Sequence, residues 1–161
     1  MIRNVAIGIL WWAFLNPLSA FSETLFTGNS DGMKYRVELV ADGLGVPWAM
    51  AFINESQIII TERKGSLKLL DLINGKIHAI KEVPAVFSKG QGGLLDVALS
   101  PDYKKGGWIY FTYSKPADDN GVTAFARAKL NGTSLGDWND LLVTNSFSEL
   151  LAPNTGLSNF L

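Results

Sequence analysis

The 161-residue sequence contains no cysteine and only one histidine, His78. Without cysteine there is neither a disulfide framework nor a thiolate nucleophile, and one histidine cannot supply a His-rich or Cys–His zinc site. A Ser-His-Asp triad would have to use His78, which lies in the strand-like segment KIHAI and is interpreted as a structural residue. These metal and nucleophile classes are therefore excluded.

An excess of positive charge is also absent. The chain has 14 Lys and Arg residues against 15 Asp and Glu residues, which gives a formal net charge of −1. A protein that binds phosphate backbones usually presents a large basic field. We therefore expect no nucleic-acid partner.

No apolar run is long enough to span a bilayer. Val5–Leu15 is an apolar segment after a basic start, but a spanning helix needs about 20 apolar residues. Asn16-Pro17 ends the run, and small residues follow up to Ser22. This order predicts a secretory signal peptide over residues 1–22, with cleavage after Ser22 or, as the next candidate, after Ala20. A membrane anchor is the alternative. The prediction implies a secreted or periplasmic protein with no membrane span after cleavage.

The remainder of the chain has the periodicity of strands. Residues 23–34 are polar and rich in turn formers, and are interpreted as a leader. Beyond them no segment shows a sustained helical period, so we predict an all-β fold. Asn74-Gly75 is the strongest signal for a two-residue hairpin. The predicted strands are 35–41, 49–53, 57–61, 66–72, 76–81, 94–100, 108–114, 122–130 and 140–144.

The strand order repeats itself. The sequence AMAF-turn-QIIIT in 49–61 is followed, roughly 50 residues later, by DVAL-turn-WIYFT in 96–112, and an Asn-Gly pair ends each half. Four short strands per repeat are typical of a β-propeller blade, and a sandwich of short strands is the alternative. The chain then supplies about two blades, whereas closure needs about four or more. We expect an incomplete propeller.

A glycine cluster, Lys89–Gly93, surrounds the polar side chain of Gln91. It lacks the GxGxxG spacing, and no predicted helix follows that would bind a phosphate. Spacing alone indicates a tight turn, although such glycines also let a backbone approach a ligand closely. Asp118–Gly121 superficially resembles a calcium loop, but Lys129 stands where the closing glutamate is needed, so we predict a solvated hairpin loop.

Several short motifs, in order and in register, resemble the glucose/sorbosone dehydrogenases, which depend on pyrroloquinoline quinone (PQQ). The similarity is strongest to their soluble periplasmic aldose sugar dehydrogenase branch and covers residues 35–145, interpreted as the N-terminal blades. The motifs are Val46–Phe52, Ile60–Gly65, Val83–Phe87, Gly90–Tyr103 and Ile109–Tyr113.

The resemblance implies a six-bladed propeller that binds PQQ over its central channel, with calcium assisting. The family oxidises the anomeric hydroxyl of an aldose to a lactone, with a histidine as the base and hydride transfer to the quinone. It places a glutamine at the position of Gln91 near the sugar and the quinone. Gln91 is thus the one substrate- or cofactor-proximal residue predicted here, and Asp96 is interpreted as structural.

The tail, 146–161, departs from the family pattern. Asn159-Phe160 stands about where the family has His-Phe, so the catalytic histidine is expected at or beyond the chain end. The resemblance also places most PQQ and calcium contacts there, which leaves no catalytic or metal-binding residue to name. We therefore expect a truncated oxidoreductase that is inactive alone. The alternative is a non-catalytic secreted propeller fragment that binds carbohydrate or a protein partner.

Overall fold

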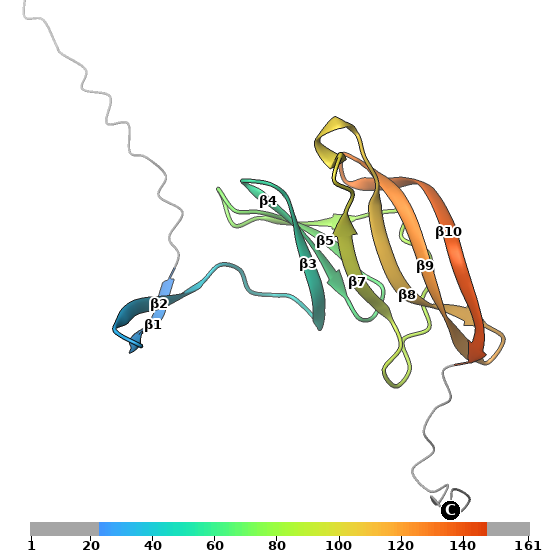
Figure 1. The fold of residues 1–161 in the computed structure, drawn as a ribbon, viewed down its shortest axis with the longest axis horizontal. Coiled ribbons are helices and arrows are strands. Elements are labelled where there is room, and N and C mark those ends of the chain that lie inside the picture. The colour runs from blue at the N-terminus through green and yellow to red at the C-terminus, as the bar shows by residue number, and fades with distance from the viewer. Residues whose placement is uncertain (1–22, 148–161) are drawn as a thin grey trace, which may run out of the picture.

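The computed structural model describes residues 23–147, which form three antiparallel sheets and one short 3₁₀ turn, η1, at Tyr103–Lys105 (Figure 1). The predicted signal peptide, 1–22, and the tail segment 148–161 with Asn159-Phe160 lie outside the described residues. Within the described part, no helix has the length and apolarity needed to cross a membrane.

Two of the sheets are four-stranded meanders in which each strand pairs with the next along the chain. They are two blades of a β-propeller, as the repeat predicted. The first blade contains β3 (Pro47–Asn54), β4 (Gln57–Glu62), β5 (Leu67–Asp71) and β6 (Ile77–Ile80). The second contains β7 (Leu94–Leu99), β8 (Ile109–Ala117), β9 (Asn120–Asn131) and β10 (Ser134–Phe147).

The two blades stack face to face around one core. Alternate residues of the central strands point into it, and Ile59 from β4 and Ile109 from β8 are both 0% exposed. The strands are rich in β-branched and aromatic residues, which favour a pleated surface buried on one side. On β9 the residues of this core cluster are the alanines Ala124, Ala126 and Ala128, and the rings of Phe111 and Trp138 stack with centroids 5.2 Å apart.

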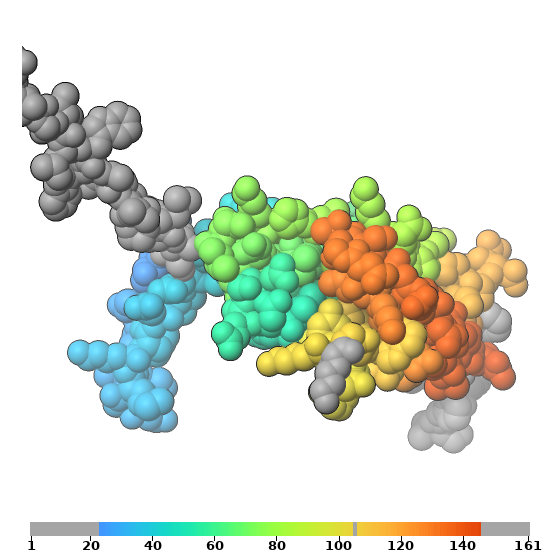
Figure 2. All heavy atoms as spheres, turned by 90° about the horizontal axis from the view of Figure 1, so that it is seen from above, coloured from blue at the N-terminus to red at the C-terminus, as the bar shows by residue number. Residues whose placement is uncertain are grey.

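The segment interpreted as a leader is a strand, and this part of the sequence prediction was wrong. β1 (Glu23–Ser30) pairs with β2 (Met33–Leu39) in a separate hairpin beside the first blade (Figures 1 and 2). The strand predicted over 35–41, whose alternating apolar residues indicate one buried side, corresponds to β2, but neither of its sides is buried. Tyr35 is 45% exposed, because sequence alternation specifies a strand but does not supply a sheet that covers it.

The hairpin turns differ from the prediction in one place. Asp31 and Gly32, between β1 and β2, both have positive φ (50° and 79°), as a two-residue turn with both central residues in the left-handed region requires. At Asn74-Gly75 only the glycine has positive φ, and the connection spans residues 72–76. The Asp71 carboxylate accepts a hydrogen bond from the amide of Ile73, which stabilises this wider loop instead.

Candidate functional site

The first strands of the two blades, β3 and β7, begin at the same edge of the stacked blades, the lower edge in Figure 1. Hydrogen bonds hold this edge together: the Arg63 amide donates to the Val46 carbonyl at 2.9 Å, and the Leu94 amide donates to the Arg63 carbonyl at 3.0 Å. We call the loops at this edge, residues 63–66 and 82–93, the rim. The rim is the only region where the sequence predicted a site.

Gln91 lies at the rim in a hydrogen-bonded turn, in which the Gly92 amide donates to the Lys89 carbonyl at 2.9 Å. On both sides of this turn the chain is anchored to β8. The Phe87 amide donates to the Ser114 carbonyl, and the Ser114 amide donates to the Gly93 carbonyl, both at 2.8 Å. The prediction of a tight turn is therefore confirmed.

The glycines of the turn are needed for packing within the chain. Gly93 is buried with φ +149°, and a Cβ there would collide with the main-chain carbonyl of Arg63. A Cβ at Gly92 would lie 3.0 Å from the Ser114 hydroxyl and still closer to the Phe87 carbonyl. The lack of a side chain at Gly93 thus lets its backbone lie against the backbone of Arg63 in the first blade.

Three consecutive residues position the rim, and sequence reasoning missed their roles: Thr61 and Glu62, which end β4, and Arg63, which follows it. The Thr61 hydroxyl donates to the Leu95 carbonyl at 2.6 Å, across the two blades. The Arg63 guanidinium donates through Nη1 to the Gly90 carbonyl at 2.5 Å. In the sequence these residues stand out only as part of the Ile60–Gly65 motif. The one local signal for these roles is that the residues come just before Gly65, a turn glycine, which indicates that they lie at the end of a strand, close to loops.

Glu62, between them, is a buried carboxylate at 7% exposure. Its Oε1 accepts a 2.6 Å hydrogen bond from the Gly45 amide, and Lys68 Nζ lies 3.8 Å from Oε2. The carboxylate therefore fixes the segment that enters β3. It is occupied by these partners and is not available to a ligand without losing them.

The Gln91 side chain is exposed, and within residues 23–147 its amide has no hydrogen-bond partner. The amide offers two donors and an acceptor from a turn that is fixed on both sides. Near it, Lys89 Nζ lies 5.6 Å from the centroid of the Phe87 ring. This arrangement can bind and orient a polar ligand, but it contains no general base.

The remaining residues singled out in the sequence lie elsewhere. His78 is exposed on β6, in a surface concavity shared with Gln57 and Thr133, at the edge opposite the rim. The Asp96 carboxylate accepts a 2.9 Å hydrogen bond from the Val97 amide, where the pairing of β7 with β8 shifts register. This contact supports the structural interpretation of Asp96. Asp118 and Asp119 form the turn between β8 and β9, as predicted for that loop.

A partly buried polar cluster lies in the second blade. Asp140 accepts hydrogen bonds from the Tyr113 hydroxyl (2.8 Å), Trp138 Nε1 (3.0 Å) and Lys115 Nζ (2.7 Å). Burial raises the pKa of Asp140. Hydrogen bonds from Lys115, Tyr113 and Trp138, together with the charge of Lys115, lower this pKa by more than burial raises it, so the net shift is downward. Burial and the bond to Asp140 raise the pKa of Tyr113. The cluster joins β8 to β10.

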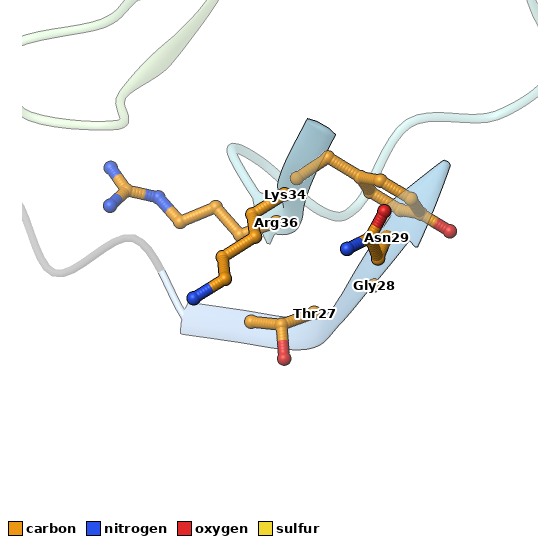
Figure 3. A pocket seen from close by; sticks show the side chains of 6 residues that line it. Thr27, Gly28, Asn29, Lys34 and Arg36 are labelled. Atoms are coloured by element: carbon orange, nitrogen blue, oxygen red, sulfur yellow. The ribbon is translucent and has the colours of Figure 1, made fainter. Parts of the chain in front are cut away.

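A second concavity lies on the β1–β2 hairpin, apart from the rim (Figure 3). Its cations, Lys34 and Arg36, extend away from Asn29 instead of converging on one point. The side chains that line it are largely exposed. The hairpin thus presents no enclosed polar site to compare with the rim.

The two stacked meanders define the class of protein as a β-propeller. Residues 44–152 match the family described as Glucose / Sorbosone dehydrogenase, and the chain belongs to this family. Aldose sugar dehydrogenase YliI of Escherichia coli (strain K12) is 37% identical over 107 residues, which are 66% of this chain and 28% of the relative. Quinoprotein glucose dehydrogenase B of Acinetobacter calcoaceticus is 28% identical over 119 residues, 68% of this chain and 25% of the relative.

Solved structures agree with the sequence comparison. The soluble aldose sugar dehydrogenase of Escherichia coli in its apo-form superposes with a TM-score of 0.63 at 32% identity, over 68% of this chain and 33% of that one. The PQQ-bound aldose sugar dehydrogenase of Streptomyces coelicolor gives 0.59 at 25% identity, over 77% of this chain and 34% of that one. This chain therefore spans about a third or less of these relatives.

Proposed function

We propose that this chain provides two blades and one ligand-orienting residue, Gln91, of a PQQ-dependent aldose sugar dehydrogenase. Membership of the family and the PQQ-bound relative support the reaction class. One observation carries the role of Gln91. Its exposed amide, without a hydrogen-bond partner among the described residues, is held on a fixed turn at the edge where the first strands of both blades begin.

In this proposal the substrate is an aldose, whose anomeric carbon is oxidised to a lactone. PQQ, when bound, supplies the electron sink that accepts the hydride. The Gln91 amide donates to or accepts from a hydroxyl of the sugar or an oxygen of the quinone, and so orients one against the other. The hydrogen-bonded turn already holds the backbone of Gln91, so binding has to order only its side chain.

The described residues fit part of a PQQ site. The rim loops carry the cations Arg63, Lys64 and Lys89, of which Arg63 reaches the Gly90 carbonyl next to Gln91, and cations suit the carboxylates of the quinone. They do not fit a calcium site, because no group of three or more acidic or other metal-ligating side chains gathers within residues 23–147. We propose that the other contacts to PQQ, and those to calcium, come from outside the described residues.

We propose that the 161-residue chain by itself does not catalyse the oxidation of an aldose. The base expected for this reaction is a histidine, and His78 lies on β6 at the edge opposite Gln91. The test mixes purified chain with PQQ, calcium, glucose and an artificial electron acceptor. We expect no acceptor reduction above the rate without protein, and clear PQQ-dependent reduction would contradict the proposal.

We also propose a periplasmic or secreted location, because the start of the sequence has the order of a signal peptide. Fractionation of a Gram-negative host that expresses the tagged chain checks this. We expect the chain in the periplasmic fraction, shortened by about 22 residues. A full-length chain retained in the cytoplasm would contradict the location without bearing on the role of Gln91.

A further inference from the structure

The chain contains three Asn-Gly pairs, Asn74-Gly75, Asn120-Gly121 and Asn131-Gly132. An asparagine followed by glycine can modify itself. The main-chain nitrogen of the glycine attacks the amide carbon of the asparagine side chain, and glycine has no Cβ to obstruct the approach. The fold decides which pair remains reactive, because hydrogen bonds to either group hold the two apart.

Asn74-Gly75 is held in place by Asp71. The Gly75 amide, which would be the nucleophile, donates to the Asp71 carbonyl at 2.8 Å. Asn74 Nδ2 donates to the Asp71 carboxylate at 3.1 Å, and Asn74 Oδ1 accepts from the Lys76 amide at 2.9 Å. Both reacting groups are therefore occupied.

Asn120-Gly121 is held by the hairpin of β8 and β9. Both residues belong to β9, and Gly121 pairs with Pro116 at the end of β8. Gly121 is also buried, and a Cβ there would lie 2.6 Å from the Phe87 ring. The rotation of the main chain that the attack requires would disturb this packing.

Asn131-Gly132 has neither kind of restraint. Asn131 is the last residue of β9, and it pairs with Ser134, the first residue of β10. Gly132 opens the two-residue turn between them with φ +63°, which is typical of a type II′ turn. Both residues of the pair are exposed. Within residues 23–147 neither the Gly132 amide nor the Asn131 side chain has a hydrogen-bond partner.

We propose that Asn131 is a site of spontaneous deamidation in the folded chain. The Gly132 nitrogen bonds to Asn131 Cγ, the bond from Cγ to Nδ2 breaks, and ammonia leaves with the proton of the Gly132 amide. Water then opens the resulting succinimide ring at either C–N bond, which yields aspartate or isoaspartate. Water is the only co-reactant, and the reaction does not depend on the proposed function.

The same turn joins the two blades. The amide of Lys81, the residue after β6, donates to the Thr133 carbonyl at 2.9 Å, and the Leu135 amide donates to the Lys81 carbonyl at 3.0 Å. In isoaspartate the main chain runs through Cβ and Cγ of residue 131 and is one atom longer. The turn is then displaced from Lys81, so we expect deamidation to loosen this contact between the blades.

The experiment follows all three asparagines in one sample. Purified chain, shown to be folded by circular dichroism, is incubated at neutral pH, and a second portion is incubated in urea. Peptide mapping by mass spectrometry measures aspartate and isoaspartate at each position over time. Asn131→Gln removes the reactive pair and keeps a side-chain amide, and Asp71→Ala removes the carboxylate that holds Asn74.

In the folded chain we expect Asn131 to deamidate severalfold faster than Asn74 or Asn120. In urea the three rates should converge, because the hydrogen bonds and packing that distinguish the pairs are lost. Asp71→Ala should raise the rate at Asn74 severalfold and leave the rate at Asn131 unchanged. The rate at Asn131 should also rise with pH, because the attacking amide has to lose its proton.

A folded chain in which Asn131 reacts no faster than Asn74 or Asn120 would overturn the proposal. Hydrogen exchange tests the effect on the blades. The Lys81 and Leu135 amides should exchange severalfold faster in incubated wild type than in incubated Asn131→Gln, and equal exchange would contradict that effect. If Asn131→Gln does not fold, Gly132→Ala replaces it, since a Cβ there meets nothing within 4 Å but shields the nitrogen.

Discussion

The main-chain carbonyl of Arg63, in the first blade, accepts a 3.0 Å hydrogen bond from the amide of Leu94, the first residue of β7 in the second blade. The side chain of the same arginine reaches Gly90 from the other direction. Arg63, which precedes Gly90 by 27 positions, therefore contacts both ends of the glycine turn that presents Gln91. The shape of the site depends on both blades.

Replacing Arg63 by alanine should loosen the turn while the chain stays folded. The change removes the bond to the Gly90 carbonyl but keeps the main-chain bond to Leu94. The lost bond is exposed, so we expect a loss of at most about 1 kcal/mol of unfolding free energy. Hydrogen exchange of residues 88–93 should nevertheless become severalfold faster. Lys64→Ala, an exposed neighbour, is the control, and equal exchange in both variants would contradict the role of Arg63.

Gly93→Ala should destabilise the protein strongly, by about 2 kcal/mol or more, because it combines a disfavoured φ with a collision against the Arg63 carbonyl. Gly132→Ala is the comparison without a collision and with a φ that alanine tolerates better. Gly132 also has a positive φ (63°), but a Cβ there meets nothing within 4 Å, so we expect about 1 kcal/mol. Urea unfolding followed by circular dichroism measures both. Equal losses would mean that packing against Arg63 contributes nothing.

Asp140→Asn should destabilise the second blade in a pH-dependent way. The pKa of Asp140 is lowered in the folded protein, so its contribution is present above the unfolded value near 3.8 and is lost as the pH falls through the folded pKa. At pH 7 we expect a loss of about 1 to 3 kcal/mol, typical of a hydrogen-bonded charge. The difference from wild type should shrink below pH 4. A difference independent of pH from 7 to 3 would argue against an ionised Asp140.

The strands of both blades could be predicted because their signals are local. Alternating apolar residues and turn formers specify β4 or β8 without knowledge of the rest of the chain. β1 was missed because ETLFTGNS is polar and lacks the β-branched run seen elsewhere. The loop at Asn74 was mispredicted because the side chain of Asp71 competes for the backbone there.

The candidate site was predictable only in part. Gln91 was found because glycines on both sides mark it and a family motif contains it. The contacts of Arg63 with Gly90 and of Tyr113 with Asp140 each join residues 27 positions apart, so no periodicity in the sequence reveals them. They depend on the stacking of the blades and on the pairing of β8 and β10 with opposite edges of β9, which only the folded chain shows.

The role of Gln91 is tested most directly in a chimera in which residues 23–147 replace the matching segment of the soluble Escherichia coli aldose sugar dehydrogenase. Steady-state kinetics with saturating PQQ and calcium then compare the chimera that carries Gln91 with its Gln91→Ala variant. We predict that kcat/KM falls roughly 5- to 150-fold, as expected for the loss of about 1 to 3 kcal/mol of hydrogen bonding in the transition state. The melting temperature should not change, because the amide has no partner among the described residues. An unchanged kcat/KM in an active chimera would contradict the account.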